Sequence, residues 1–187
     1  MTALSATDRA QSAPPGPARF TTAEFWRMVE GDAFGDVKVE LVEGELHRMP
    51  PPGRRHGQLQ GALILRLGRF IPETRLIGEV AIGLENDTVV GCDVAVLGFE
   101  SGTSSIVAPE EVLLAVEIAV STLDRDLGLK RRLYAAAGIA TYWVVDAERA
   151  VIHVFDRPEG DDYRGLVLVR FGEPLPVPGT GATIVLG

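Results

Sequence analysis

The sequence predicts a mixed α/β domain in which helices pack on a β-sheet, and three observations lead to this fold class. Helix-like and strand-like segments follow one another in the order helix, hairpin, helix, strands, helix, strands. The segment VLLAVEIAV, residues 112–120, is apolar at every position except Glu117 and predicts a central strand that is covered on both faces. The next segment, 121–138, has the caps and the periodicity of an amphipathic helix.

The N-terminal part predicts a tail, a short helix, a hairpin and a second helix. Residues 1–18 are rich in Ala, Ser and Pro and are expected to be disordered, which leaves 19–187 as a single domain. Thr21 or Thr22 can cap a helix that begins near residue 22. Residues 37–49 flank Glu43-Gly44 and predict a β-hairpin. After the Pro-rich break at 50–53, helical spacing of apolar residues predicts a helix over 54–71, with Leu59, Leu63, Leu67 and Phe70 on one face.

The rest of the chain supplies most of the predicted sheet. Residues 75–86 and 92–99 predict two strands, with 86–91 as the turn region between them, and 100–110 predict a loop. The helix over 121–138 has Ser121 or Thr122 as its cap and ends at Gly138. Strands are predicted at 141–147, 150–156 and 163–171, before a Pro- and Gly-rich tail. Neither GxGxxG nor GxxxxGK[ST] occurs, which argues against Rossmann and P-loop phosphate sites.

Composition narrows the class of protein. The 187 residues, of which 46% are hydrophobic, suit one globular domain. The net charge of −8 gives no general attraction to nucleic acid, so any such contact has to be local. The single cysteine, Cys92, excludes an intrachain disulfide and a cysteine-rich zinc site, and it fits a reducing, cytoplasmic location. No stretch approaches the roughly 18 consecutive apolar residues of a membrane span, so no membrane association is expected.

Three carboxylates stand in segments that are otherwise apolar. Glu117 interrupts the predicted central strand, Asp93 lies in CDVAVLGF, and Glu40 lies between Val39 and Leu41. An isolated buried carboxylate is expensive in free energy, and it usually shifts its pKa, finds a partner or binds a cation. The three positions are therefore candidates for a polar site inside the fold.

Lys130 is the fourth ionisable residue in an apolar context. At about 100° per residue, it falls in the middle of the apolar arc of the helix over 121–138, away from the charged side that carries Arg125 and Arg132. Short strand–helix connections normally pack the two elements together, so Lys130 is expected to point back at the carboxylates. Asp126 is expected to serve the helix N-terminus, although it lies one turn before Lys130 and could pair with it.

The chemistry that these residues favour is metal-assisted hydrolysis of a phosphodiester. Two strand carboxylates that converge make a hard oxygen site, which suits Mg²⁺ or Mn²⁺. A nearby lysine can orient or activate a water and offset developing negative charge. Three plainer interpretations stay open: carboxylates that face water at a sheet edge, a lysine whose head reaches solvent, and a buried Lys–Glu pair of structural role.

Four blocks of the chain carry a family resemblance that runs from about Phe20 to Phe155, namely RFTTAEFWRMVE, KVELVEGELHRMPPPGRRHGQLQGAL, CDVAV and VLLAVEIAVSTLDRDLGLKRRLYAAAGIATYWVVDAE. They resemble the Uma-two family of restriction endonucleases, which is grouped with the PD-(D/E)XK nuclease superfamily. The resemblance implies a restriction-endonuclease-like fold, a mixed β-sheet flanked by α-helices. It also implies a metal-dependent nuclease centre that acts on DNA, and a homodimer is plausible.

The resemblance also implies roles for the four residues. Asp93 and Glu117 would ligate Mg²⁺ (or Mn²⁺), helped by the backbone carbonyl of Ile118. Lys130 would position or activate the water, and Glu40 would support the metal or a bound water. Backbone contacts with DNA are expected from a local basic cluster made of Arg54, Arg55, His56, Arg66 and Arg69.

The chain departs from the family pattern at three positions. The superfamily lysine stands two residues after the strand glutamate, where this chain has Ala119, so Lys130 would supply the amine from the next element. Val120 stands where an Asp is common, and Cys92 stands where a Pro is usual. The leading interpretation is a metal-dependent DNA endonuclease. Two alternatives are a non-catalytic binding or assembly module on a degenerate nuclease scaffold, and a hydrolase of a small phosphorylated substrate.

Overall fold

The computed structural model describes residues 16–100, 102 and 104–187. The expected disorder of residues 1–18 falls almost wholly on positions outside these ranges. The elements, in chain order, are α2 (Thr22–Glu30), β1 (Val39–Val42), β2 (Glu45–Arg48), α3 (Arg54–Leu67), β3 (Leu76–Leu84), β4 (Thr88–Leu97), β5 (Ile106–Val107), β6 (Val112–Ala119), α4 (Leu123–Arg125), a π-helical segment (Asp126–Lys130), α5 (Arg131–Ala136), β7 (Thr141–Asp146), β8 (Val151–Glu159), β9 (Asp162–Arg170), β10 (Pro174–Pro176) and β11 (Thr183–Val185). Short 3₁₀ turns lie at Glu73–Arg75 and Pro109–Glu111.

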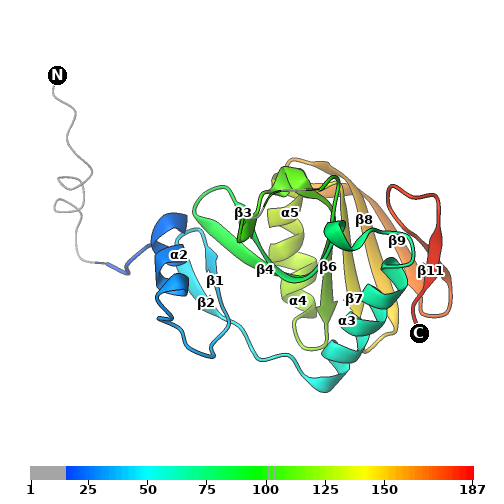
Figure 1. Ribbon diagram of the computed structural model, residues 1–187, viewed down its shortest axis with the longest axis horizontal. Helices are drawn as coiled ribbons and strands as arrows, with labels where there is room; N and C mark the ends of the chain where they lie inside the picture. Colours follow the sequence, from blue (N-terminus) through cyan, green and yellow to red (C-terminus); the bar gives the residue numbers. More distant parts are fainter. Residues whose placement is uncertain (1–15, 101, 103) are drawn as a thin grey trace.

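The architecture is the mixed sheet with flanking helices that the sequence predicts (Figure 1). The nine-stranded sheet has the order β2-β1-β4-β6-β7-β8-β9, with β3 paired to β4 and β5 paired to β3. Strands β6 and β7 run parallel, and β4 is antiparallel to both β3 and β6. The central position expected for 112–120 is confirmed, because β6 lies between β4 and β7. Among the described residues, no helix is long and apolar enough to cross a membrane.

Local chemistry explains the first two elements. The Thr21 hydroxyl accepts from the backbone N–H of Glu24, and the Glu24 carboxylate accepts from the backbone N–H of Thr21, which is a capping box at the start of α2. The hairpin β1–β2 turns at Glu43 and Gly44, whose φ angles are 50° and 81°. Two successive positive φ angles give the tight turn that matches the twist of a hairpin.

Four details of the predicted elements are wrong. Helix α3 ends at Leu67, before Gly68, and Phe70 is 45% exposed outside it. The turn between β3 and β4 is shorter than 86–91, because Thr88, Val89 and Val90 favour a strand and pair with β3. The predicted loop contains β5, which pairs with β3. The Pro- and Gly-rich tail forms the β10–β11 hairpin.

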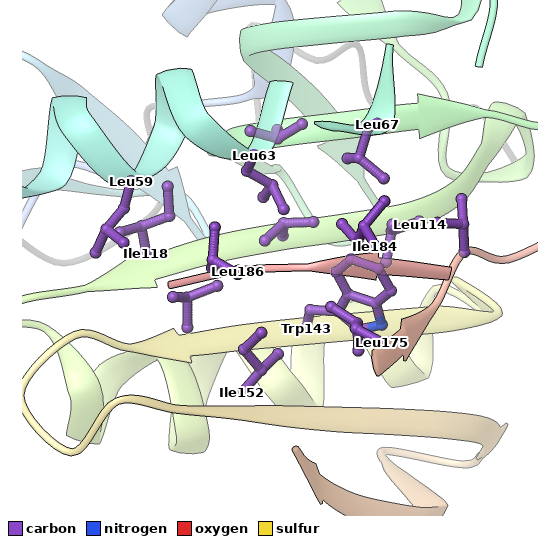
Figure 2. Close-up of a cluster of buried hydrophobic side chains, with 14 of the residues drawn as sticks. Leu59, Leu63, Leu67, Leu114, Ile118, Trp143, Ile152, Leu175, Ile184 and Leu186 are labelled. Atoms are coloured by element: carbon purple, nitrogen blue, oxygen red, sulfur yellow. The ribbon is translucent and has the colours of Figure 1, made fainter. Parts of the chain in front are cut away.

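Two hydrophobic layers cover the two faces of the sheet. On one face, Leu59, Leu63 and Leu67 of α3 pack with Trp143 of β7 and with the β10–β11 hairpin. Figure 2 shows these α3 leucines pointing toward the sheet above Ile118 and Trp143. On the other face, Tyr134 and Ala135 of α5 pack with Tyr142, Val144 and Phe155. Helices therefore approach β6 from both sides, which places side chains of two layers around its carboxyl end.

The helix expected over 121–138 is not regular. It begins with α4, continues through the π-helical segment and ends with α5. The backbone N–H of Arg131 donates to the carbonyl of Asp126, five residues back. Such a turn holds more residues than an α-helical turn, so it brings residues five apart closer to one side of the helix than an α-helix does. The expected end of the helix is confirmed, because Gly138 follows the C-cap with a φ of 74°.

Candidate active site

The candidate site occupies a fork between two strands. The β4–β6 ladder ends at the pair Val94↔Val116, and β4 then continues toward β1, with which it pairs at Val89. The alternation of side chains along β4 also breaks at Asp93, because Cys92 and Ala95 face the same hydrophobic layer although they are three residues apart. Opposite Asp93 on β3, Glu79 has a φ of 54°. The fork and this local distortion give the Asp93 side chain access to the space beside β6.

Lys130 joins two carboxylates from different strands. Its Nζ atom lies 2.9 Å from Glu117 Oε1 and 3.0 Å from Glu40 Oε1, and it donates to the Gly91 carbonyl at 2.6 Å. Glu40, Glu117 and Lys130 are each no more than 3% exposed. Glu117 Oε1 also accepts from the Tyr134 hydroxyl at 2.7 Å. The structure thus brings together three of the four residues singled out in the sequence, and none of the three faces bulk water.

Asp93 is held from the opposite layer. Its Oδ2 atom accepts from the backbone N–H of Ile118 at 2.8 Å and lies 2.9 Å from His56 Nε2. Gln60, one turn after His56 on α3, donates to the Asp93 carbonyl at 2.8 Å. Asp93 is 7% exposed. Helix α3 therefore fixes Asp93, while the helix that follows β6 fixes Glu117.

One cavity of about 270 Å³ collects these groups. Asp93, Glu117, Ile118 and Lys130 line it, and the segment 49–53 closes one side. Among the hydrogen bonds between described residues, none reaches Asp93 Oδ1 or Glu117 Oε2. The two side chains come from neighbouring strands and line the same cavity, so these two oxygens are the ones left for a ligand. No group of three or more His, Cys, Asp or Glu side chains that could hold a metal occurs in the described ranges.

Burial and ion pairing set the charge of the cluster. Burial lowers the pKa of Lys130, but the Glu117 and Glu40 carboxylates outweigh it and hold this pKa above its ordinary value, so the amine stays charged. Burial raises the pKa of Glu117 well above its usual range, and Lys130 offsets part of that rise. Burial alone would raise the pKa of Glu40, but Lys130 and Arg125 hold it below its ordinary value. Burial alone would also raise the pKa of Asp93, but His56 and the Ile118 N–H hold it below its ordinary value. The cavity therefore encloses two carboxyl groups whose pKa is lowered, Glu40 and Asp93, and one whose pKa is raised, Glu117.

Three residues of the cluster were not singled out as site residues in the sequence. The helical wheel predicts that Arg125 lies on the charged, outward side of the helix, which is wrong: its guanidinium pairs with Glu40. The π-helical turn is the reason, because Arg125 and Lys130 are five residues apart and so face the same side. Asp126 lies four residues before Lys130, and Tyr134 lies four residues after it. This spacing is the sequence signal that indicates that both lie on the same side of the helix as Lys130. Asp126 is 3% exposed, lines the cavity and accepts from the Thr122 hydroxyl at 2.6 Å.

The expected basic cluster is divided. Arg54, Arg55 and His56 lie in the first turn of α3, and His56 enters the cavity. Arg66 lies three turns away, and its guanidinium donates to the carbonyls of Ala62 and Val185. Arg69 follows the end of α3. Since a helix rises about 1.5 Å per residue, Arg66 and Arg69 stand roughly 15–20 Å along α3 from the cavity end.

Asp126 gives the protein a pH-dependent stability. Burial raises the pKa of Asp126 from 3.8 to about 6, so the folded protein binds this proton more tightly than the unfolded chain does. The stabilisation from this proton is complete below the unfolded pKa and is lost as pH rises through about 6. Ionised Asp126 therefore works against folding at neutral pH.

We expect Asp126→Asn to raise the free energy of unfolding more at about pH 7 than at about pH 4. The asparagine oxygen can still accept from Thr122, so the change isolates the carboxyl charge. Urea unfolding in EDTA at the two pH values measures the difference. Asp124→Asn, at an exposed position of the same helix, is the matched control. An equal effect of Asp126→Asn at both pH values would contradict the buried, proton-binding state of Asp126.

Comparisons with known proteins agree with the resemblance seen in the sequence. The family model Uma2, described as "Putative restriction endonuclease", matches residues 23–185. A solved structure that is similar to this chain is described as a putative nuclease belonging to DUF820 from Anabaena variabilis ATCC 29413. It is 18% identical, the match covers 89% of this chain and 94% of that chain, and the TM-score is 0.67. This likeness confirms the nuclease-like α/β fold. No curated protein matches the sequence.

Proposed function

The chain belongs to the Uma2 family of putative restriction endonucleases, and from its cavity we propose that it is a metal-dependent endonuclease that hydrolyses phosphodiester bonds in DNA. The observation that carries the proposal is that the carboxylates of Asp93 and Glu117 line one cavity from neighbouring strands. Each has one oxygen, Asp93 Oδ1 and Glu117 Oε2, without a hydrogen-bond partner among the described residues. Cytoplasmic location and a homodimer remain predictions alongside it.

The donor set of the cavity fits Mg²⁺ or Mn²⁺. Both ions prefer oxygen ligands, and Mg²⁺ is commonly held by one or two carboxylates with waters and substrate phosphate completing its shell. Two carboxylates and the Ile118 backbone therefore suffice, although the described residues include no larger metal-binding group. When bound, such an ion lowers the pKa of a water and stabilises negative charge on phosphate.

The residues of the chain have separate tasks in this proposal. His56 and the Ile118 N–H orient Asp93 by occupying its Oδ2 atom, which leaves Oδ1 directed to the ligand. Lys130 and Tyr134 occupy Glu117 Oε1 and leave Oε2. Glu40 holds Lys130 and Arg125 in place. The charged Lys130 amine also offsets negative charge that develops near the scissile phosphate.

Contacts with DNA in this proposal come from the N-terminal turn of α3. Arg54 and Arg55 are exposed there, directly before His56 of the cavity. A protein with a net charge of −8 needs such a local cationic surface to approach phosphates. Arg66 and Arg69, at the other end of α3, would contact DNA only along a longer stretch of backbone.

A non-catalytic binding or assembly role on the same scaffold is the second candidate, and one observation favours it. The Lys130 ammonium has three acceptors inside the protein, namely Glu40, Glu117 and the Gly91 carbonyl. An ammonium group has three N–H donors, so these contacts satisfy it without any ligand. A buried ion-pair network of purely structural role would have the same arrangement.

Calorimetric titration with Mn²⁺ distinguishes the two candidates. The endonuclease proposal expects one Mn²⁺ site in the wild type and its loss in Asp93→Asn, because the substitution removes the charge of a ligand whose position is already fixed. Asp124→Asn, an exposed neighbour of the cavity, should bind like the wild type. Absence of binding to the wild type would overturn the metal proposal and leave the non-catalytic role. Metal-dependent nicking of a plasmid is the accompanying assay.

A further inference from the structure

A second cavity adjoins the candidate site. It has a volume of about 220 Å³ and lies between α2, β1, β3 and β4. In Figure 1, α2 and the β1–β2 hairpin lie beside the β3–β4 hairpin, at the end of the molecule away from β11. The two cavities share Lys38 and Glu40 in their walls. A ligand that extends from the first cavity past Lys38 therefore enters the second one.

Most of the wall of this second cavity is apolar, and it includes one accessible aromatic ring. Trp26 of α2 is partly buried, Val29 beside it is 38% exposed, and Val80 and Val89 come from the sheet. Indole and valine surfaces on two sides make a slot that favours a flat, apolar-faced ring. The capping box at Thr21 fixes the start of α2, so the Trp26 side of the slot rests on a defined helix.

The polar groups of the second cavity sit together near the shared wall. Lys38 Nζ lies 3.0 Å from Glu79 Oε2, and both side chains are partly exposed. Glu79 Oε1 also accepts from Gln60, the residue that holds the Asp93 carbonyl. The backbone of Glu79 has a φ of 54°, a conformation that non-glycine residues rarely adopt. Such strained residues cluster at functional sites. The slot thus offers a donor and an acceptor beside an aromatic face.

We propose that the Trp26 cavity receives an unpaired nucleobase of a DNA strand whose backbone phosphate lies in the first cavity. The inference rests on the proposed function and adds to it the form of the substrate. A nucleobase has a flat face for the indole and polar edges for Lys38 and Glu79. A phosphate is a poorer match, because most of the wall is apolar and Lys38 is already paired with Glu79. A base inside an intact duplex is stacked and paired, so it has to leave the helix to enter.

The expected substrate is therefore single-stranded DNA, or a duplex with unpaired bases. Base–aromatic stacking is tolerant of sequence, since every base has a π-face. The slot alone would consequently favour unpaired bases without selecting one sequence. This sets the protein apart from an enzyme that reads base edges in the major groove of an intact duplex.

Tryptophan fluorescence tests the proposal directly. The chain has two tryptophans, and Trp143 is fully buried in the core, so a change in emission on binding reports on Trp26. In EDTA, which prevents cleavage, we expect a single-stranded oligodeoxynucleotide to quench the emission. A strand of the same length made of abasic sites, with the same phosphates, should not quench at saturation. Equal quenching by the abasic strand, or no quenching by the strand with bases, would overturn the proposal.

Variants separate stacking from general binding. By fluorescence anisotropy of a labelled single strand, Trp26→Ala should weaken binding at least about fivefold, and Trp26→Phe should stay within about twofold of the wild type. Circular dichroism checks that both variants fold. Equal affinities of the alanine and wild-type proteins would refute stacking on Trp26. The quenching is measured in EDTA and does not require the Mn²⁺ site, so a failed Mn²⁺ site and a failed base pocket give different results.

Discussion

Replacing Lys130 with methionine is expected to lower the free energy of unfolding by about 3–5 kcal/mol. The substitution keeps the volume of the side chain but leaves Glu117 without a cation and leaves Glu40 with Arg125 alone. Both carboxyl groups are almost fully buried. The loss should be larger at about pH 8 than at about pH 5, because protonation of Glu117 relieves the unpaired charge.

Urea unfolding followed by circular dichroism measures this loss. Arg132→Met is the matched control, since Arg132 is exposed on the same helix and its replacement should change stability by no more than about 0.5 kcal/mol. The double variant Lys130→Met with Glu117→Gln should recover part of the loss, because it removes the carboxyl charge that has lost its cation. A Lys130→Met protein as stable as the Arg132→Met protein would show that the buried cluster does not depend on the ammonium group.

Glu117→Gln is expected to slow metal-dependent DNA cleavage by at least about a thousandfold, or about 4 kcal/mol in activation free energy. Glutamine keeps the shape of the side chain, and its amide oxygen can still accept from Lys130 and Tyr134. Lys130 keeps Glu40 and the Gly91 carbonyl as partners, so loss of the Glu117 charge should leave the protein folded and should lower its stability less than Lys130→Met does. Activity and stability should therefore respond separately.

Plasmid cleavage in Mn²⁺, together with thermal unfolding of the same preparations, checks this separation. Glu110→Gln is the matched control, because Glu110 is exposed near the other end of β6. It should cleave like the wild type. If Glu117→Gln cleaves at an unchanged rate, Glu117 has no part in the reaction. If it unfolds, its contribution is mainly structural.

Much of the candidate site was predictable because its residues violate their local pattern. Glu40, Glu117 and Lys130 are ionisable residues at positions where the surrounding pattern predicts an apolar one. The structure brings the three side chains together. Their convergence from distant segments follows from the strand–helix connection after β6, which the sequence pattern also indicates. Ala119 and Val120 differ from the residues that the family pattern has at these positions. Ala119 supplies no amine, and Lys130 enters the cluster from the helical segment after β6.

Other parts depend on geometry that a helical wheel and a turn pattern do not contain. Arg125 was placed outward because a wheel assumes a constant 100° step, which the π-helical turn breaks. The β10–β11 hairpin was hidden by its Pro and Gly residues, although Leu175 and Ile184 are buried in the core. The Trp26 cavity has no sequence signature, since it forms between a helix and three strands that meet only in the folded protein.

The wide turn at Asp126–Lys130 has a consequence for how the length of this helix can vary. A π-helical turn holds one residue more than an α-helical turn. Loss of one residue there would let the turn close into regular α-helix while the flanking segments kept their places. Arg125 and Lys130 would then be four residues apart in a regular α-helix, a spacing that also places both side chains on one face. A five-residue spacing across a π-helical turn and a four-residue spacing across an α-helical turn therefore both allow two cations to share one carboxylate, as Arg125 and Lys130 share Glu40 here.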